Sequence, residues 1–393
     1  MKALVVHALF DVLGGGELLA LRASQALQEA GFDVKILTAT PVDPPVLSRV
    51  YGGVKLPEVI VKRVKTAEYA SRLMPGRLVR LRRLLVYRQY MPLIEELRNE
   101  YDLVIDTQSN LPTPADLVYI HFPAILELHV ERHGLQWRVY GLLVKHLARP
   151  FKAPRAGRVL TNSTWTAHMV YKAYGVVPDV VYPPVDVEFF NLYASSDKRE
   201  KLVVTISRFT PEKGLEKLVE AAKVLPDYKF VFVGTVGAGS ERVLGNIEEE
   251  ARRSGLSNVE VRPNLPRTEV ARLLGEASFY LHPPFPEHFG ISIVEAMAAG
   301  AVPLVYRDGG GWYDVVSRVS SELGYCDVRE VPGIIRRLEA DRGLYEELRR
   351  RSVEVSKLFG YDNFKKSFLE KVSYVLRVKK LGQQREEPNK CST

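Results

Sequence analysis

The stretch SFYLHPPFPEHFGISIVEAMAAGAVPLVY (278–306) decides the fold. It begins with a short run of apolar and aromatic residues, 278–283, which predicts a buried strand. A rigid PPFP turn follows, and Gly290 precedes a run of small and aliphatic residues that predicts a helix over 291–299. The segment VPLVY (302–306) predicts a second strand. A strand, a helix and a strand in this order are typical of a parallel sheet with a crossover helix.

The same alternation of short apolar runs and amphipathic runs continues on both sides of this stretch. Further buried strands are predicted at 2–9, 33–39, 102–107, 116–122, 158–162, 179–185, 202–208, 229–234 and 259–262. Two sets of this kind predict an α/β protein with two Rossmann-like parallel-sheet domains, over 1–185 and 186–360. A final helix over about 361–380 is expected to return to the first domain, and 381–393 is expected to be a polar tail.

Length and composition are those of a globular protein that needs no disulfides for stability. The chain has 393 residues, of which 46% are hydrophobic and 26% charged, and only two cysteines, Cys326 and Cys391. Two cysteines exclude a disulfide scaffold and a multi-cysteine zinc site, and they fit a reducing compartment. No apolar run approaches the roughly 18 residues of a membrane-spanning helix. We therefore expect a cytoplasmic protein whose first apolar stretch is a buried strand rather than a signal peptide.

The positive charge gathers in the first half of the chain. The net charge is +8, and residues 1–183 hold 23 Lys and Arg against 16 Asp and Glu. The segment 62–88 alone has nine basic residues and one acidic residue, with leucine and valine among the arginines. A basic amphipathic helix of this kind binds anionic membrane surfaces, and a solvated helix face is the equally weighted alternative. A nucleic-acid-binding protein is disfavoured, because no interleaved aromatic RNA-binding signature is present.

Two loops that follow predicted strands carry residues suited to phosphate binding. Gly14, Gly15 and Gly16 lie between a strand and a helix, where the backbone can approach an anion. The alternative is a tight turn, and a dinucleotide oxidoreductase is disfavoured because the G-x-G-x-x-G fingerprint is absent. In the second loop, Arg208 and Lys213 are placed to bind a diphosphate. The alternative there is a short capped helix with solvated charges.

Two glutamates and a histidine complete the set of candidate residues. Glu287 lies in the loop before the helix predicted over 291–299, and Glu295 lies one turn into that helix. Ser292 and Glu295 match a capping box, so Glu295 has a purely structural alternative, whereas no such role is evident for Glu287. His121 ends a predicted strand, and a lone histidine at such a position is more often a packing or hydrogen-bonding residue.

In their order along the chain, these elements resemble the family 4 retaining glycosyltransferases of the GT-B fold. The strongest match is EHFGISIVEAMAAGAVPLVYRDGGG (287–311), which carries the E-x₇-E motif of that family at Glu287 and Glu295. The segment ISRFTPEKGLEKLVEA (206–221) resembles the family's diphosphate-binding loop. Four stretches look closest to the α-1,2-mannosyltransferases that extend lipid-linked oligosaccharides: GGGE (14–17), YIHFP (119–123), VLTNSTWT (159–166) and EHFGISIVEAMAAG (287–300).

The resemblance implies a role for each matching residue. Arg208 and Lys213 would hold the donor diphosphate and stabilise it as it leaves. Glu295 would accept hydrogen bonds from the ribose hydroxyls, and Glu287 would contact the transferred sugar. The other implied donor-site groups are the backbone at Phe289, Gly290 and Ile291, the backbone at Gly15 and Gly16, and the imidazole of His121 near the reacting centre.

The resemblance implies the GT-B fold, in which two Rossmann-like domains face a cleft. The implied activity is the transfer of a hexose, with mannose as the expected sugar, from a donor to an acceptor. The donor would be a nucleoside-diphosphate sugar such as GDP-mannose, and the acceptor a glycan or a lipid-linked molecule on the cytosolic face of a membrane. Anomeric configuration would be retained, with no cofactor and no metal, and the chain has no D-x-D motif. A sugar-nucleotide epimerase or a phosphorylase-like enzyme of the same fold is the alternative.

Overall fold

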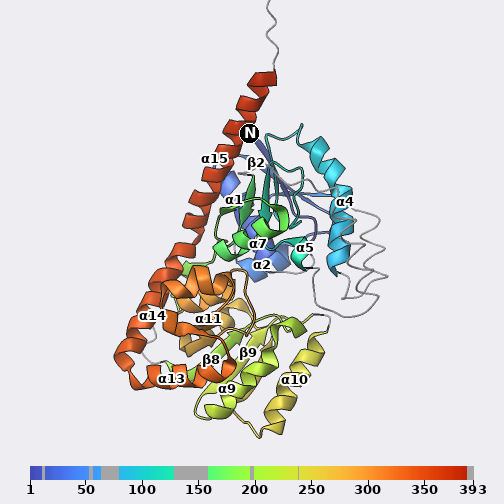
Figure 1. Cartoon of the computed structure of the whole chain (residues 1–393). Helices are drawn as coiled ribbons and strands as arrows, with labels where there is room; N and C mark the ends of the chain where they lie inside the picture. The colour runs from blue at the N-terminus through green and yellow to red at the C-terminus, as the bar shows by residue number, and fades with distance from the viewer. Residues whose placement is uncertain are drawn as a thin grey trace, which may run out of the picture. The chain divides into compact units, whose positions relative to one another are not determined.

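The chain forms two compact units. The computed structural model describes residues 1–10, 14–52, 56–62, 79–127, 158–194, 199–237 and 239–386. The first unit comprises the described residues within Met1–Asn162, Thr166–Val181 and Phe364–Thr393. The second comprises those within Ser163–Trp165 and Tyr182–Asn363. Figure 1 shows the elements of both units, coloured along the chain.

A seven-stranded parallel sheet forms the centre of the first unit. Its strands lie in the order β3-β2-β1-β4-β5-β6-β7, and every neighbouring pair is parallel. The central strand β4 is buried along its whole length, as expected for an apolar run that helices cover on both faces. The strands are β1 (Lys2–Val6), β2 (Asp33–Thr38), β3 (Glu58–Val61), β4 (Leu103–Asp106), β5 (Leu117–Ile120), β6 (Val159–Thr161) and β7 (Asp179–Val180).

The helices of the first unit pack apolar faces against this sheet. In the helix labelled α4, Tyr87, Tyr90 and Ile94 are buried at a helical spacing and belong to the core. The predicted basic segment 62–88 lies largely outside the described residues, and its described end belongs to this helix. The helices are α1 (Gly15–Glu29), α2 (Pro44–Tyr51), α4 (Val79–Leu97), α5 (Ala124–Glu127), α7 (Thr164–Tyr174) and, from Phe364 on, α15 (Tyr361–Glu386).

The second unit repeats the arrangement with a six-stranded parallel sheet. Its order is β10-β9-β8-β11-β12-β13, and every neighbouring pair is parallel. The strands are β8 (Glu200–Ile206), β9 (Lys229–Gly234), β10 (Val259–Pro263), β11 (Ala277–Leu281), β12 (Val302–Tyr306) and β13 (Gly324–Tyr325). The helices are α8 (Val187–Asn191), α9 (Val219–Val224), α10 (Ser240–Arg253), α11 (Arg267–Glu276), α12 (Ile291–Ala298), α13 (Val331–Ala340) and α14 (Arg342–Ser356).

The predicted fold class is confirmed, since both sheets are parallel and both have the Rossmann-like strand order. Strands β3 and β13, which are only four and two residues long, and the helix pair α13 and α14 were not predicted from the sequence. The final helix continues to Glu386, so the predicted boundary between helix and polar tail at residue 381 is wrong. The remaining tail, 387–393, lies outside the described residues.

Candidate active site

In each sheet, the strand order places the candidate residues of that unit at the point where the order reverses. In the first sheet, β2 and β3 lie on one side of β1, while β4 and the later strands lie on the other. In the second sheet, β8 and β11 form the corresponding pair. Loops that follow such a pair diverge and leave a crevice, where open α/β sheets bind ligands. Gly14–Gly16 follow β1, Arg208 follows β8 and Glu287 follows β11.

The loops after β8 and β11 meet through an ion pair between Lys213 and Glu287. Lys213 Nζ lies 2.7 Å from Glu287 Oε2 and 4.4 Å from the centre of the Phe285 ring. The two charged side chains are only 10% and 25% exposed. Burial opposes the ionisation of Glu287, but the charge of Lys213 and then a hydrogen bond from His282 outweigh it and hold the pKa of Glu287 well below its usual range. Two residues predicted from separate motifs therefore form one charged cluster.

Glycines in the loop 308–311 hold the backbone around Glu287. Glu287 forms a parallel bridge with Gly309, and the Gly311 N–H donates to the Glu287 carbonyl at 3.3 Å. A Cβ at Gly309 would clash with the Glu287 carbonyl oxygen, and one at Gly310 would clash with the His288 carbonyl oxygen. A side chain at either position would push the loop 308–311 away from Glu287, which explains why the sequence has glycine there.

Gly290 turns the chain from this loop into α12. Its φ is +91°, in the left-handed region that favours glycine. The helix begins at Ile291, and the described residues offer no backbone acceptor for the N–H groups of Phe289, Gly290 and Ile291. The Phe289 side chain is buried, with its ring centre 5.3 Å from that of Phe359. Because its side chain is buried, Phe289 can contact a ligand only through its backbone.

The loop after β8 carries one exposed and one buried cation. Arg208 is exposed, and it forms no ion pair within the part of the chain that the structure describes. Lys213 is buried at the end of a short 3₁₀ helix, Pro211–Lys213. The alternative of a capped helix with solvated charges holds only in part. Thr210 is the N-cap residue and Pro211 follows it, but the Thr210 side chain makes no capping bond and Lys213 is buried. The Thr210 hydroxyl is buried without a hydrogen-bond partner among the described residues.

Glu295 does not cap α12, so the capping-box alternative is wrong. Ser292 is the second residue of the helix rather than its N-cap, and its Oγ lies 2.9 Å from the Tyr280 hydroxyl. Burial raises the pKa of Glu295 to about 7, and the charge of Arg267 partly offsets this effect. Glu295 is thus a carboxyl that changes charge near neutral pH without a structural hydrogen bond to α12.

In the first unit, His121 and Gly16 are neighbours. A Cβ at Gly16 would lie 3.7 Å from His121 Nε2. That nitrogen lies 2.9 Å from the Thr107 carbonyl oxygen, which can only accept, so Nε2 carries a proton. The backbone N–H of His121 donates to Asn110 Oδ1 at 2.8 Å. The ring is therefore fixed beside the start of α1, where Gly15 and Gly16 are the first two helical residues.

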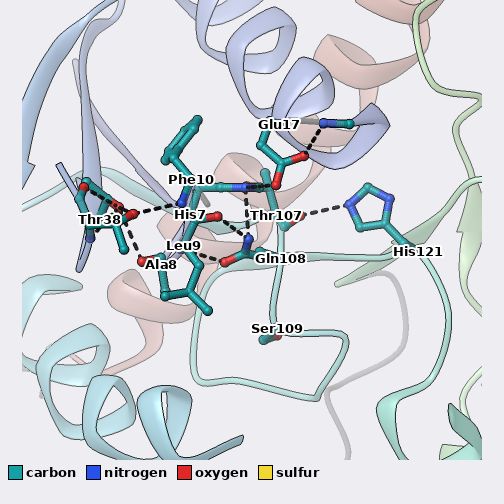
Figure 2. Close-up of polar contacts among 12 residues, drawn as sticks. His7, Ala8, Leu9, Phe10, Glu17, Thr38, Thr107, Gln108, Ser109 and His121 are labelled. Atoms are coloured by element: carbon teal, nitrogen blue, oxygen red, sulfur yellow. Dashed lines mark hydrogen bonds and ion pairs between the residues drawn. The ribbon is translucent and has the colours of Figure 1, made fainter. Parts of the chain in front are cut away.

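A buried polar cluster at the start of α1 was not predicted from the sequence. Figure 2 shows His7 between Thr107, Gln108 and Glu17, with His7 Nδ1 3.0 Å from Thr107 Oγ1 and Nε2 3.1 Å from Gln108 Nε2. Glu17 Oε1 lies 3.6 Å from His7 Nε2, and Glu17 Oε2 accepts from the Gly14 N–H at 3.0 Å. Burial opposes ionisation of Glu17, but the bond and charge of His7 outweigh it and lower its pKa. An anion at this helix start must therefore be accommodated beside a carboxylate.

The described residues hold neither a cluster suited to a metal ion nor a helix suited to span a membrane. They contain no group of three or more His, Cys, Asp or Glu side chains arranged to hold a metal ion. Among them, too, no helix has the length and apolar character needed to cross a bilayer.

Glu295→Gln is expected to remove a pH-dependent destabilisation. Because the pKa of Glu295 rises from 4.5 to about 7 on folding, the native state keeps a proton that the unfolded chain releases between these values. The stability that this proton confers is present below pH 4.5 and is lost as the pH rises to about 7. Relative to that of the wild type, the free energy of unfolding of the variant should rise by about 1 to 3 kcal/mol as the pH increases over this range, as measured by urea unfolding. A difference that does not change with pH would contradict a buried carboxyl.

The Lys213–Glu287 pair is expected to contribute to stability as well as to function. Lys213→Met leaves a largely buried carboxylate without its cation, and should destabilise the protein by about 1 to 3 kcal/mol. Glu287→Gln should also destabilise it, because Lys213 loses its partner. A double-mutant cycle of the two changes, measured by urea unfolding, should show a coupling of about 1 kcal/mol or more. Additive effects would mean that the pair is not a stabilising contact.

Two family models match the chain and together cover most of it. Residues 13–189 match the model described as "Glycosyltransferase Family 4". Residues 193–351 match the model described as "Glycosyl transferases group 1". The first match includes Gly15, Gly16 and His121, and the second includes Arg208, Lys213, Glu287 and Glu295.

Curated relatives resemble part of the chain. The GDP-Man:Man(3)GlcNAc(2)-PP-Dol alpha-1,2-mannosyltransferase of Dictyostelium discoideum is 30% identical over 233 residues, which is 54% of this chain and 46% of that protein. The Homo sapiens protein of the same name is 32% identical over 174 residues, which is 40% of this chain and 35% of that protein. The matched part of this chain thus spans less than half of the length of these relatives.

A solved structure shares the fold over nearly the whole chain. Anabaena HepE, crystallised in complex with UDP and glucose, superposes with a TM-score of 0.67 at 20% identity, covering 95% of this chain and 99% of that one. At this identity the likeness shows the fold alone. Given the two matched domains and two Rossmann-like parallel sheets, the chain belongs to the GT-B glycosyltransferases that combine a family 4 domain with a group 1 domain, and α-1,2-mannosyltransferases are among its curated relatives.

Proposed function

We propose that this chain is a retaining glycosyltransferase that moves a hexose from a nucleoside-diphosphate sugar to a glycan or lipid-linked acceptor, without a metal ion. The observation that carries the proposal is the ion pair between Lys213 and Glu287 at the switch point of the second sheet. This pair offers a cation to a leaving diphosphate and a carboxylate to a sugar within one hydrogen-bond distance. When a sugar–diphosphate bond breaks, negative charge develops on the diphosphate and positive charge on the sugar, and this pair can stabilise both.

Arg208 and Lys213 are the proposed contacts of the leaving diphosphate. Negative charge builds on that group as the bond to the sugar breaks, and preorganised cations stabilise it in the transition state. Arg208 is exposed and supplies a planar fork that matches two phosphate oxygens. Lys213 has three N–H donors, so it can bond a phosphate oxygen while it keeps its bond to Glu287.

Glu287 and Glu295 are the proposed contacts of the sugar and the ribose. The sugar carbon gains positive, oxocarbenium-like character as the bond breaks. The low pKa of Glu287 keeps its carboxylate ionised at neutral pH, so its negative charge favours that state. Glu295 accepts from the ribose hydroxyls. The N–H groups of 289–291 at the start of α12, which have no backbone acceptor among the described residues, would bind the diphosphate or the sugar hydroxyls.

The first unit is proposed to supply Gly15, Gly16 and His121. The two glycines approach the diphosphate through their backbone, and His121, which neighbours Gly16, bonds the sugar. The acceptor oxygen attacks the anomeric carbon on the face that the diphosphate leaves. Its proton passes to a phosphate oxygen as the new carbon–oxygen bond forms and the old one breaks. Attack on that face retains the anomeric configuration.

The names of the curated relatives support a particular donor and acceptor. They describe transfer of mannose from GDP-mannose to a dolichol-linked oligosaccharide. We therefore propose mannose as the sugar, GDP-mannose as the donor and a lipid-linked glycan as the acceptor. The reaction would take place on the cytosolic face of a membrane, where the enzyme binds peripherally.

Arg208→Ala and Lys213→Ala are each expected to lower the rate of transfer by about 10²- to 10³-fold. The measurement is release of nucleoside diphosphate with GDP-mannose, UDP-glucose, UDP-GlcNAc or ADP-glucose as donor. Lys217→Ala is the matched control, because Lys217 is an exposed lysine on the next turn of the same segment. A near wild-type rate for either variant at saturating donor would contradict its assignment as a contact of the leaving diphosphate. Interconversion of the donor sugar without release of diphosphate would indicate an epimerase instead.

The described part of α15 supports membrane binding independently of the segment 62–88. This helix buries one apolar face in the first unit and exposes a second apolar stripe, Tyr374, Val378 and Leu381, with exposed fractions of 48%, 41% and 61%. Arg377 and Lys380 are exposed beside the stripe. Two copies of this face would bring like charges together, so we propose that it contacts an anionic lipid surface rather than a second copy.

Replacing the stripe with serine (Tyr374→Ser, Val378→Ser and Leu381→Ser together) is expected to reduce binding to anionic vesicles several-fold. Binding is measured by co-sedimentation with vesicles of phosphatidylcholine alone and with vesicles that also contain phosphatidylglycerol. Tyr171→Ser with Val177→Ser is the control, since both are exposed apolar residues elsewhere in the first unit. Wild-type pelleting of the stripe variant, with loss in an Arg80, Arg82 and Arg83 variant, would assign the contact to the segment 62–88 instead.

A further inference from the structure

His282 lies buried behind the Lys213–Glu287 pair, and the proposed function gives it no role. It follows β11, and its Nε2 lies 3.4 Å from Glu287 Oε2. Its Nδ1 lies 3.0 Å from the Pro283 carbonyl oxygen, and its own carbonyl accepts a hydrogen bond from the Tyr325 hydroxyl. The imidazole is therefore fixed between a carbonyl on one side and a carboxylate on the other.

These two neighbours determine where the ring carries its protons. A carbonyl oxygen can only accept a hydrogen bond, so Nδ1 of His282 must be the donor to Pro283. In the neutral ring, Nε2 would then direct a lone pair at an oxygen of Glu287, which also carries lone pairs. The doubly protonated ring donates to both neighbours. The contacts of His282 thus favour the imidazolium form.

The imidazolium form changes the charge of the cluster. Lys213 and Glu287 together have no net charge, so their pair attracts a diphosphate only weakly. A charged His282 gives the cluster a net charge of +1. We infer that His282 is a positioning residue, which shares the negative charge of Glu287 so that Lys213 directs its own charge to the leaving diphosphate. This inference rests on the proposed donor site.

The ionisable groups that face His282 come from each neighbouring element. Lys213 comes from the loop after β8, Glu287 from the loop after β11, Tyr280 from β11 and Tyr325 from β13. His288 adjoins Glu287 in the same loop. Burial raises the pKa of both tyrosines, so they stay neutral, and the pKa of Glu287 is low, so it stays charged. Among these neighbours, histidine is the side chain whose charge changes between mildly acidic and mildly basic pH. Elsewhere in the proposed donor site, Glu295 also changes charge near pH 7, so the test removes its carboxyl.

The first test is calorimetric titration of GDP-mannose between about pH 6 and pH 8.5, a range in which the diphosphate of the intact nucleotide sugar does not titrate. The titrations are made in a Glu295→Gln background, because the Glu295 carboxyl of the proposed donor site also changes charge in this range. In this background the affinity should fall about tenfold as the pH rises, the equivalent of about 1.4 kcal/mol. Adding His282→Gln, which keeps a donor near Nε2 but cannot gain a charge, should make the affinity about tenfold lower at pH 6 and nearly independent of pH. Adding His288→Gln or His168→Gln, the latter an exposed residue in the first unit, should keep the slope of the background. An unchanged slope after His282→Gln would overturn the inference.

The second test needs no nucleotide. The ¹⁵N spectrum of the imidazoles in the ligand-free wild type, with the His282 signals assigned by their loss in His282→Asn or His282→Gln, should show both nitrogens protonated at about pH 6. A neutral ring at that pH would overturn the inference whatever the enzyme binds. An imidazolium in a protein that binds none of the tested nucleotide sugars would instead contradict the proposed donor site, which separates the two failures.

Discussion

The parallel pairing of β8 with β11 is the constraint on which the charged site of the second unit depends. The two strands run side by side in the centre of the sheet, so their carboxyl ends open at the same edge. The connections that follow them go to opposite sides of the sheet. Lys213 and Glu287 lie 74 positions apart in the sequence, and this pairing brings Lys213 Nζ within 2.7 Å of Glu287 Oε2. The pairing of β1 with β4 does the same for His7 and Thr107, which are 100 positions apart and 3.0 Å from each other.

The charges of the site have a structural role as well as a proposed catalytic one. A largely buried carboxylate and a largely buried ammonium are each unfavourable alone, and each satisfies the other here. The backbone beside them is tied down by Gly309 and Gly310, where no side chain fits. The ligand-free site is therefore already ordered, and a donor that binds Lys213 has to share it with Glu287. Such a preorganised site is what stabilisation of a developing charge requires.

The sequence predicted the features that repeat or that lie close together in the chain. Alternating apolar runs predicted the two parallel sheets, and the spacing of Glu287 and Glu295 predicted two carboxyls near the start of α12. It did not predict His282 or His7 as members of charged clusters. Thr107 and Gln108 reach His7 from another strand, and Glu287 lies only five positions after His282, but a lone buried histidine has no distinctive pattern. The capping-box pattern at Ser292 failed for a related reason. Gly290, with its positive φ, begins the helix earlier, and the serine bonds Tyr280 instead.

Both units place a carboxylate beside the N-terminus of a helix. Each has a carboxylate at the edge of its sheet, beside the N-terminus of a helix that would otherwise attract an anion: Glu17 accepts from the Gly14 N–H at α1, and Glu287 accepts from the His288 N–H before α12. An anionic donor bound at either place meets this negative charge. Among the described residues, the ion-pair neighbour of Glu17 is His7, whereas Glu287 has Lys213 and His282, and Arg208 lies in the same loop as Lys213. Among the described residues, cations thus exceed carboxylates at the site of the second unit, and this excess is why we propose that the second unit holds the diphosphate as it gains negative charge.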